Sequence, residues 1–200
     1  MFRNIMSKDL LPILCKETWH LDSRNECEIK FKEDGTGELI CINELQAYIA
    51  AQIEWKSLSA KRPNDAALSN ESKHQDSPAV VAQFILDITL TKRHITSRGP
   101  FDNYYINDER LTDEAFGTRQ YHVNLEKGNF HSAFDMRMPS VPDWAPVFAY
   151  RLVFDKSPYP LPSLWKEPDD APDPEWFPLA DWREFCAWKL ERDAAQKADS

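Results

Sequence analysis

The chain has 200 residues, a formal net charge of −9 and an apolar fraction of 42% that includes seven tryptophans. This length fits a single domain, and the composition is typical of a folded protein with a large core. The acidic balance argues against nucleic acid and anionic membranes as partners, because both attract clustered Lys and Arg.

The N-terminal apolar run over residues 10–15 is interrupted by Pro12 and is too short for a signal-peptide core or a membrane span. We therefore expect a cytoplasmic protein whose cysteines are free thiols. These are Cys15, Cys27, Cys41 and Cys186. Their spacing contains no Cys-x-x-Cys motif, so the sequence predicts no metal site, and no other motif indicates a cofactor.

A period-two alternation of apolar and polar residues dominates the first part of the chain and predicts β-strands. A first strand is expected over 17–21. Residues 26–42 follow as a hairpin, because Cys27, Ile29 and Phe31 alternate with charged residues and Asp34-Gly35 provides the chemistry of a tight turn.

The same alternation predicts further strands over 49–56, 79–95, 121–126, 130–136 and 148–154. Residues 101–116 are expected to form a short Tyr-rich strand followed by an acidic turn. A turn is expected at 126–129 and a mobile loop at 59–78, where the periodicity is lost. The total is eight or nine strands without interleaved helices. This pattern predicts a mainly β fold, an antiparallel up-and-down barrel over about 16–156 in a single domain.

The C-terminal part of the chain has a different character. Residues 139–178 contain ten of the fourteen prolines, which favours an extended chain, and we expect an outer belt over 157–178 anchored by aromatic residues. Leu179, Trp182, Phe185 and Lys189 then fall at helical spacing, with Asp181 as a possible N-cap. They predict an amphipathic helix over 179–194 packed on the barrel.

A Trp near the start of the first strand, a hairpin meander with a Gly-containing turn and a C-terminal helix together resemble the lipocalin-like (calycin) barrels. The stretch "ETWHLDSRNECEIKFKEDGTGELI", with "IEW" and "RLVFDKSPYP", also resembles a group of uncharacterised proteins of filamentous fungi. The lipocalin resemblance implies that Trp19 plugs the closed end of the barrel. The Gly-x-Trp pattern of that family is not complete here, because Glu17 stands in place of the glycine.

A barrel of eight strands is just wide enough to be filled by side chains or to hold one small ligand. Alternation directs large side chains to its interior, and we name as candidate ligand-binding residues Trp19, Phe31, Trp55, Phe84, Tyr121 and Tyr150. The two tyrosine hydroxyls either hydrogen-bond within the core or orient a ligand. His20 and His122 are expected to point outward. His94 is the one candidate catalytic residue, since it falls where a strand emerges at the barrel rim.

Three functions remain open on this basis. The first is binding of a small hydrophobic molecule in the barrel. The second is a cofactor-free isomerase or cyclase that acts on a hydrophobic metabolite and uses one proton-transfer group. The third is a protein-interaction module that uses Trp165 and Trp176 of the Pro-rich belt. The sequence specifies no oligomeric state.

Overall fold

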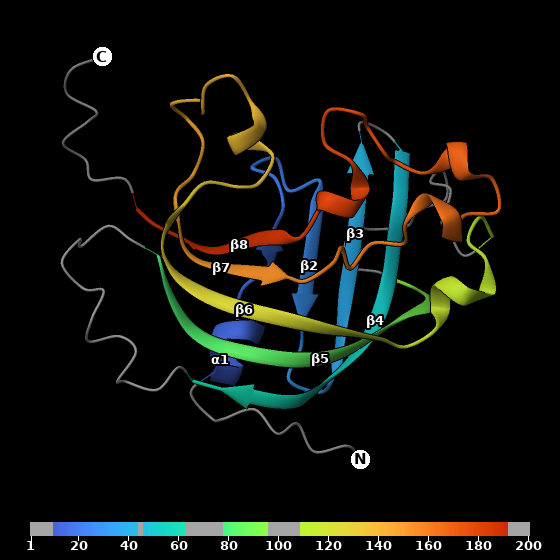
Figure 1. Ribbon diagram of the computed structural model, residues 1–200, viewed down its shortest axis with the longest axis horizontal. Coiled ribbons are helices and arrows are strands. Elements are labelled where there is room, and N and C mark those ends of the chain that lie inside the picture. The colour runs from blue at the N-terminus through green and yellow to red at the C-terminus, as the bar shows by residue number, and fades with distance from the viewer. Residues whose placement is uncertain (1–9, 44–45, 63–77, 96–108, 192–200) are drawn as a thin grey trace.

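The computed structural model describes residues 10–43, 46–62, 78–95 and 109–191. In its single antiparallel sheet each strand pairs with the next along the chain, and the last pairs back to the first, so the sheet closes into a barrel-like ring (Figure 1). The expected mainly β, antiparallel architecture of about eight strands is confirmed. The strands are β1 (Trp19–His20), β2 (Cys27–Phe31), β3 (Thr36–Asn43), β4 (Gln46–Lys61), β5 (Ala79–His94), β6 (Arg119–Phe130), β7 (Phe148–Phe154) and β8 (Glu184–Lys189).

The hairpin of β2 and β3 forms as its sequence predicts. Gly35 adopts a φ of 85°, which favours glycine, and its N–H donates to the Lys32 carbonyl at 3.1 Å. The Asp34 carboxylate accepts hydrogen bonds from the N–H and the hydroxyl of Thr36 at 2.8 and 2.6 Å. A Cβ at Gly37 would lie 2.2 Å from the Lys30 carbonyl oxygen, so the close approach of the strands requires glycine there.

Two long strands depart from their predicted limits, and one predicted strand is replaced by other structure. β4 continues to Lys61, so the predicted loop begins too early, and its remainder over 63–77 lies outside the described residues. β6 runs through the turn expected at 126–129, because β7 pairs with it as far as Phe130 and a bulge after Lys127 accommodates the irregular stretch. The strand expected over 130–136 is wrong beyond Phe130, and the short 3-10 helix η2 (Asp135–Arg137) stands there instead.

The predicted Tyr-rich strand, with Tyr104 and Tyr105, lies outside the described residues, since 101–108 are not among them. After it, where an acidic turn is expected, the structure has an isolated bridge between Leu111 and Trp165 and the short 3-10 helix η1 (Asp113–Phe116).

The C-terminal amphipathic helix is also wrong. The chain forms a short 3-10 helix η5 (Leu179–Asp181) and then β8, which fills the gap between β7 and β1. The backbones of β7 and β1 would otherwise be unpaired edges, and pairing both of them outweighs a helical spacing in the sequence. Arg151 of β7 reinforces this closure, because its guanidinium donates to Glu126 on β6 and to Glu184 on β8, each at 2.7 Å.

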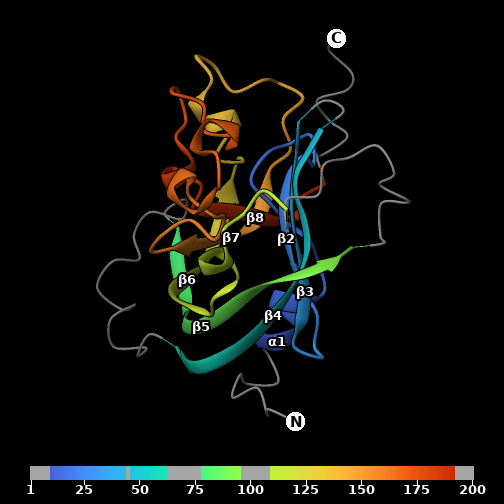
Figure 2. The same cartoon turned by 90° about the vertical axis from the view of Figure 1, so that its right-hand side faces the viewer.

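The two ends of the ring are covered by different segments (Figures 1 and 2). The helix α1 (Leu10–Cys15) lies at one end. The Pro-rich segment, which includes the 3-10 helices η3 (Pro162–Leu164) and η4 (Pro168–Asp170), lies towards the other. Within this segment Tyr159 and Phe177 are fully buried in the main core, whereas Leu161 and Trp176 are exposed. No helix among the described residues is long and apolar enough to cross a membrane.

Candidate functional site

The interior of the barrel is lined by one continuous apolar cluster to which every strand contributes. Along β5, for example, Ala82, Phe84, Leu86, Ile88 and Leu90 are buried and alternate with more exposed residues. All six candidate ligand-binding residues belong to this cluster or pack against it. They come from six strands, so the fold brings side chains that are far apart in the sequence onto one inner surface.

Trp19 lies fully buried at the α1 end of the barrel. Its indole N–H donates to the Leu14 carbonyl of α1 at 2.9 Å, and Leu10 and Leu14 are themselves buried. The side chain is therefore a fixed part of the closure, since its one polar atom already has a partner.

Phe31 and Trp55 meet edge to face, with ring centroids 5.3 Å apart. The Trp55 indole N–H is shared between the carbonyls of Lys32 and Thr36 at 3.1 and 2.9 Å. Trp55 therefore braces the turn between β2 and β3. Because its polar atom is occupied by the turn, it offers a ligand an apolar ring surface only.

The other three candidates lie on β5, β6 and β7. Phe84 and Tyr121 are almost fully buried, and the Tyr121 ring meets Phe154 edge to face at 5.8 Å. Burial raises the pKa of the Tyr121 phenol above its ordinary value, so the group stays neutral. Tyr150 is half-buried, and its ring contacts Trp188, whose indole donates to the Ile13 carbonyl in α1.

Four aromatic side chains at the end opposite α1 were not among the predicted site residues. We call them the aromatic plug: Phe134, Tyr159, Phe177 and Trp182. Phe134 meets Phe177 and Trp182 at centroid distances of 5.0 and 5.6 Å, and Tyr159 meets Trp182 at 5.5 Å. None of them belongs to a strand.

Polar contacts anchor the plug at its edges. The Tyr159 hydroxyl donates to the Ile40 carbonyl of β3 at 2.7 Å, and the Trp182 indole N–H donates to the Phe177 carbonyl at 2.9 Å. Behind the plug, Tyr159 contacts Phe185 of β8 at 6.1 Å. For Tyr159 and Phe177 the sequence signal is an aromatic residue between prolines, whereas Phe134 and Trp182 lie outside the Pro-rich stretch. Neither signal carries information about which end of the barrel these residues reach.

The histidines lie at separate places. His20 faces outward, stacks on Phe148 at 6.1 Å and has its Nδ1 3.4 Å from the Glu28 carboxylate. His122 is exposed on β6. His94 is exposed at the last position of β5, opposite Ala51. The outward positions predicted for His20 and His122 and the rim position predicted for His94 agree with this placement.

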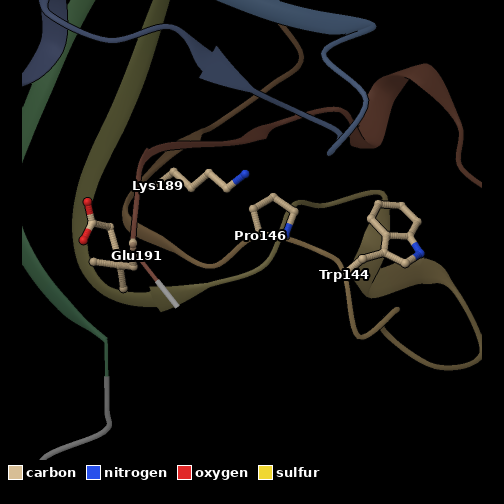
Figure 3. A pocket seen from close by; sticks show the side chains of 5 residues that line it. Trp144, Pro146, Lys189 and Glu191 are labelled. Atoms are coloured by element: carbon tan, nitrogen blue, oxygen red, sulfur yellow. The ribbon is translucent and has the colours of Figure 1, made fainter. Parts of the chain in front are cut away.

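Among the clefts lined by described residues, three lie open on the outside of the barrel. One of them has a volume of about 480 Å³ and is lined mainly by polar residues around the β2–β3 turn and by Trp55. A second, of about 310 Å³, lies over β5 and β6 and includes His122. The third, of about 320 Å³, lies between Trp144 and Pro146 on one side and Lys189 and Glu191 on the other (Figure 3).

The tryptophans of the Pro-rich segment differ in exposure. Trp165 is buried, and its indole N–H donates to the Pro160 carbonyl at 3.1 Å. Trp176 is 57% exposed, although one edge of its ring meets Phe134. Of the two tryptophans on which a protein-interaction module would depend, Trp176 is therefore exposed and Trp165 is not.

Within the described residues, no three His, Cys, Asp or Glu side chains are grouped so that they could hold a metal ion. Comparisons of the chain with protein-family models, with curated proteins and with solved structures found no match. The site is therefore interpreted from its own geometry.

Proposed function

We propose that this chain binds a small hydrophobic molecule in the interior of a lipocalin-like barrel, with entry at the end covered by the aromatic plug. The up-and-down order of the eight strands and the inward Trp19 on β1 support the lipocalin-like assignment. The interior offers an apolar surface, which favours an apolar ligand through burial of its surface.

The main support for the proposal is a difference in how the two ends of the barrel are covered. At the α1 end a helix covers the interior and main-chain carbonyls hold Trp19 and Trp188. At the other end the cover consists of side chains from segments without strand pairing, in contact with one another through ring faces and edges. Segments of this kind open at a lower free-energy cost than paired strands, so this end is the entrance.

Binding then requires the plug to move. The apparent affinity equals the affinity of the open barrel multiplied by the fraction of molecules in which the plug is open, so a larger open fraction gives tighter binding. The test uses cis-parinaric acid, a fluorescent fatty acid, with the wild-type chain and with Tyr159→Ala. Removal of the ring and of its hydroxyl bond to Ile40 raises the open fraction. We expect saturable binding at one site and at least about tenfold tighter binding to Tyr159→Ala.

Trp144→Ala is the matched control, because Trp144 lines an exterior cleft and lies 58% exposed. It should leave the probe affinity unchanged if the probe enters the barrel. If neither the wild-type chain nor a folded Tyr159→Ala variant binds the probe with saturation, the proposal is wrong. An affinity that changes only in Trp144→Ala would place the probe on the surface and would also contradict it.

A further inference from the structure

Cys27 and Cys41 face each other directly across β2 and β3. The Cys27 thiol donates to the Cys41 sulfur at 3.2 Å, and both residues are buried, with 4% and 1% of their surface exposed. All four cysteines of the chain are free thiols in this structure. Cys27 and Cys41 are thus adjacent thiols with no other side chain between their sulfur atoms.

The position of this pair in the ladder suits a cross-strand disulfide. The Ile42 N–H donates to the Glu26 carbonyl at 2.8 Å, and the Lys32 N–H donates to the Thr36 carbonyl at 2.8 Å. Hydrogen-bonded pairs alternate along an antiparallel ladder, so Cys27 and Cys41 form a non-hydrogen-bonded pair. The Cα atoms of such a pair lie about 4.5 Å apart, inside the range that a disulfide spans.

We propose that Cys27 and Cys41 are a thiol-disulfide site, at which a small-molecule disulfide such as glutathione disulfide converts the pair into an intramolecular bond between β2 and β3. The two sulfur atoms need to approach by only about 1 Å to reach the length of that bond. The proposal does not depend on ligand binding by the barrel.

The Cys27–Cys41 bond forms through two successive thiol–disulfide exchanges. One cysteine loses its proton, and its thiolate attacks glutathione disulfide, which breaks the S–S bond and forms a mixed disulfide and one glutathione. The second cysteine loses its proton and attacks the protein sulfur of the mixed disulfide, which forms the Cys27–Cys41 bond and releases the second glutathione. The two protein thiols are oxidised, and one glutathione disulfide is reduced to two thiols that take up the two protons.

The other two cysteines lie elsewhere in the fold and provide internal controls. Cys15 ends α1, and Cys186 lies on β8, where its thiol donates to the His131 carbonyl at 3.5 Å. Burial raises the pKa of Cys15 and of Cys186 to about 12, so both thiols are poor nucleophiles in the folded chain. Neither is paired with another cysteine across a strand.

Burial also determines when the bond forms. The hydrogen bond to Cys41 and the loss of solvent raise the pKa of Cys27 well above its ordinary value, so little thiolate exists in the folded state. Oxidation is therefore expected as the chain folds, when β2 and β3 have paired but the core over them is still open. We expect the folded, reduced protein to react at least about tenfold more slowly than the refolding chain.

The test refolds the reduced, denatured chain in glutathione disulfide, blocks remaining thiols with iodoacetamide and measures the mass before and after tryptic digestion. Trypsin cleaves between the two cysteines at Lys30 and Lys32 and releases peptides 25–30 and 33–56. We expect two of the four thiols to be alkylated, with these two peptides joined by a bond that dithiothreitol breaks.

The Cys15→Ser/Cys186→Ser double variant keeps both sulfurs of the site and should give the same linked peptides. Cys27→Ser should give none, and circular dichroism checks that it folds. Four alkylated thiols in the wild-type chain, stable glutathione adducts, or links through Cys15 or Cys186 would each overturn the proposal. The decisive measurements use the wild-type chain and the double variant, so they hold even if Cys27→Ser fails to fold.

Discussion

The two ends of the barrel are closed by different kinds of structure, a helix at one end and loop segments at the other. At the α1 end, Trp19 donates its indole hydrogen bond to Leu14, only five residues away, and this contact can form as soon as its own segment folds. At the plug end, the Tyr159 hydroxyl donates to Ile40, 119 residues away. That contact, like the bond from the Trp188 indole to the Ile13 carbonyl at the α1 end, requires the barrel to be assembled first.

The difference also concerns what each closure is made of. The α1 end consists of a helix whose buried leucines pack under a tryptophan of the sheet itself. The plug consists of ring contacts between loop segments, added onto the completed barrel. One end is therefore part of the framework of the fold and the other is an addition to it, and substitutions at the two ends should separate these roles.

The largest effect is expected for Trp19→Ala. This side chain is fully buried and hydrogen-bonded, and replacement of a buried Trp by Ala typically costs about 3–5 kcal/mol of the free energy of unfolding. Urea unfolding monitored by circular dichroism measures the loss. Trp144→Ala, at an exposed tryptophan, should stay within about 0.5 kcal/mol. Equal losses in the two variants would contradict a framework role for Trp19.

A smaller loss is expected for Phe177→Leu in the aromatic plug. Leucine keeps most of the buried apolar volume but removes the edge-to-face contact with Phe134, so the free energy of unfolding should fall by about 1–2 kcal/mol. Amide hydrogen exchange should show faster opening around Tyr159 with little change around Trp19. Uniformly faster exchange at both ends would mean that the plug and the framework unfold as one unit.

Removal of one hydroxyl tests the polar anchor of the plug. Tyr159→Phe loses the hydrogen bond to the Ile40 carbonyl and should cost about 1 kcal/mol of the free energy of unfolding. Tyr150→Phe, at a half-buried tyrosine, serves as the comparison and should cost less. A larger loss in Tyr150→Phe would show that the hydroxyl bond to β3 does not hold the plug in place.

The smallest effect is expected at the turn between β2 and β3, at the α1 end of the barrel. Asp34→Ala removes the two hydrogen bonds from Thr36 and should lower the free energy of unfolding by about 0.5 kcal/mol, because the site is exposed.

These same bonds hold the pKa of Asp34 below its ordinary 3.8 in the folded chain. A carboxylate with a lowered folded pKa stabilises the protein above the unfolded pKa and loses that contribution as the pH falls through the folded value. The difference between wild type and Asp34→Ala should therefore shrink as the pH falls below 3.8. Urea midpoints measured between pH 5 and pH 2.5 check this trend, and a difference that grows on acidification would reverse the assigned role.

Local residue patterns are sufficient to predict the first meander and the inner face of the barrel. In β2, β3 and β5 one face is buried and the other meets water, so the period of two is visible in the residues, and the Asp34-Gly35 turn fixes the register between neighbouring strands. The six candidate ligand-binding residues were predicted in the same way, from parity along single strands.

The closure of the ring and the cover of its second end depend on contacts between distant parts of the chain. In β8, Phe185, Cys186 and Ala187 are all buried, because both faces of this strand are covered, and the alternation that would distinguish a strand from a helix is lost. Its conformation follows from the unpaired backbones of β1 and β7. The plug likewise depends on contacts between residues over a hundred positions apart, which no local pattern encodes.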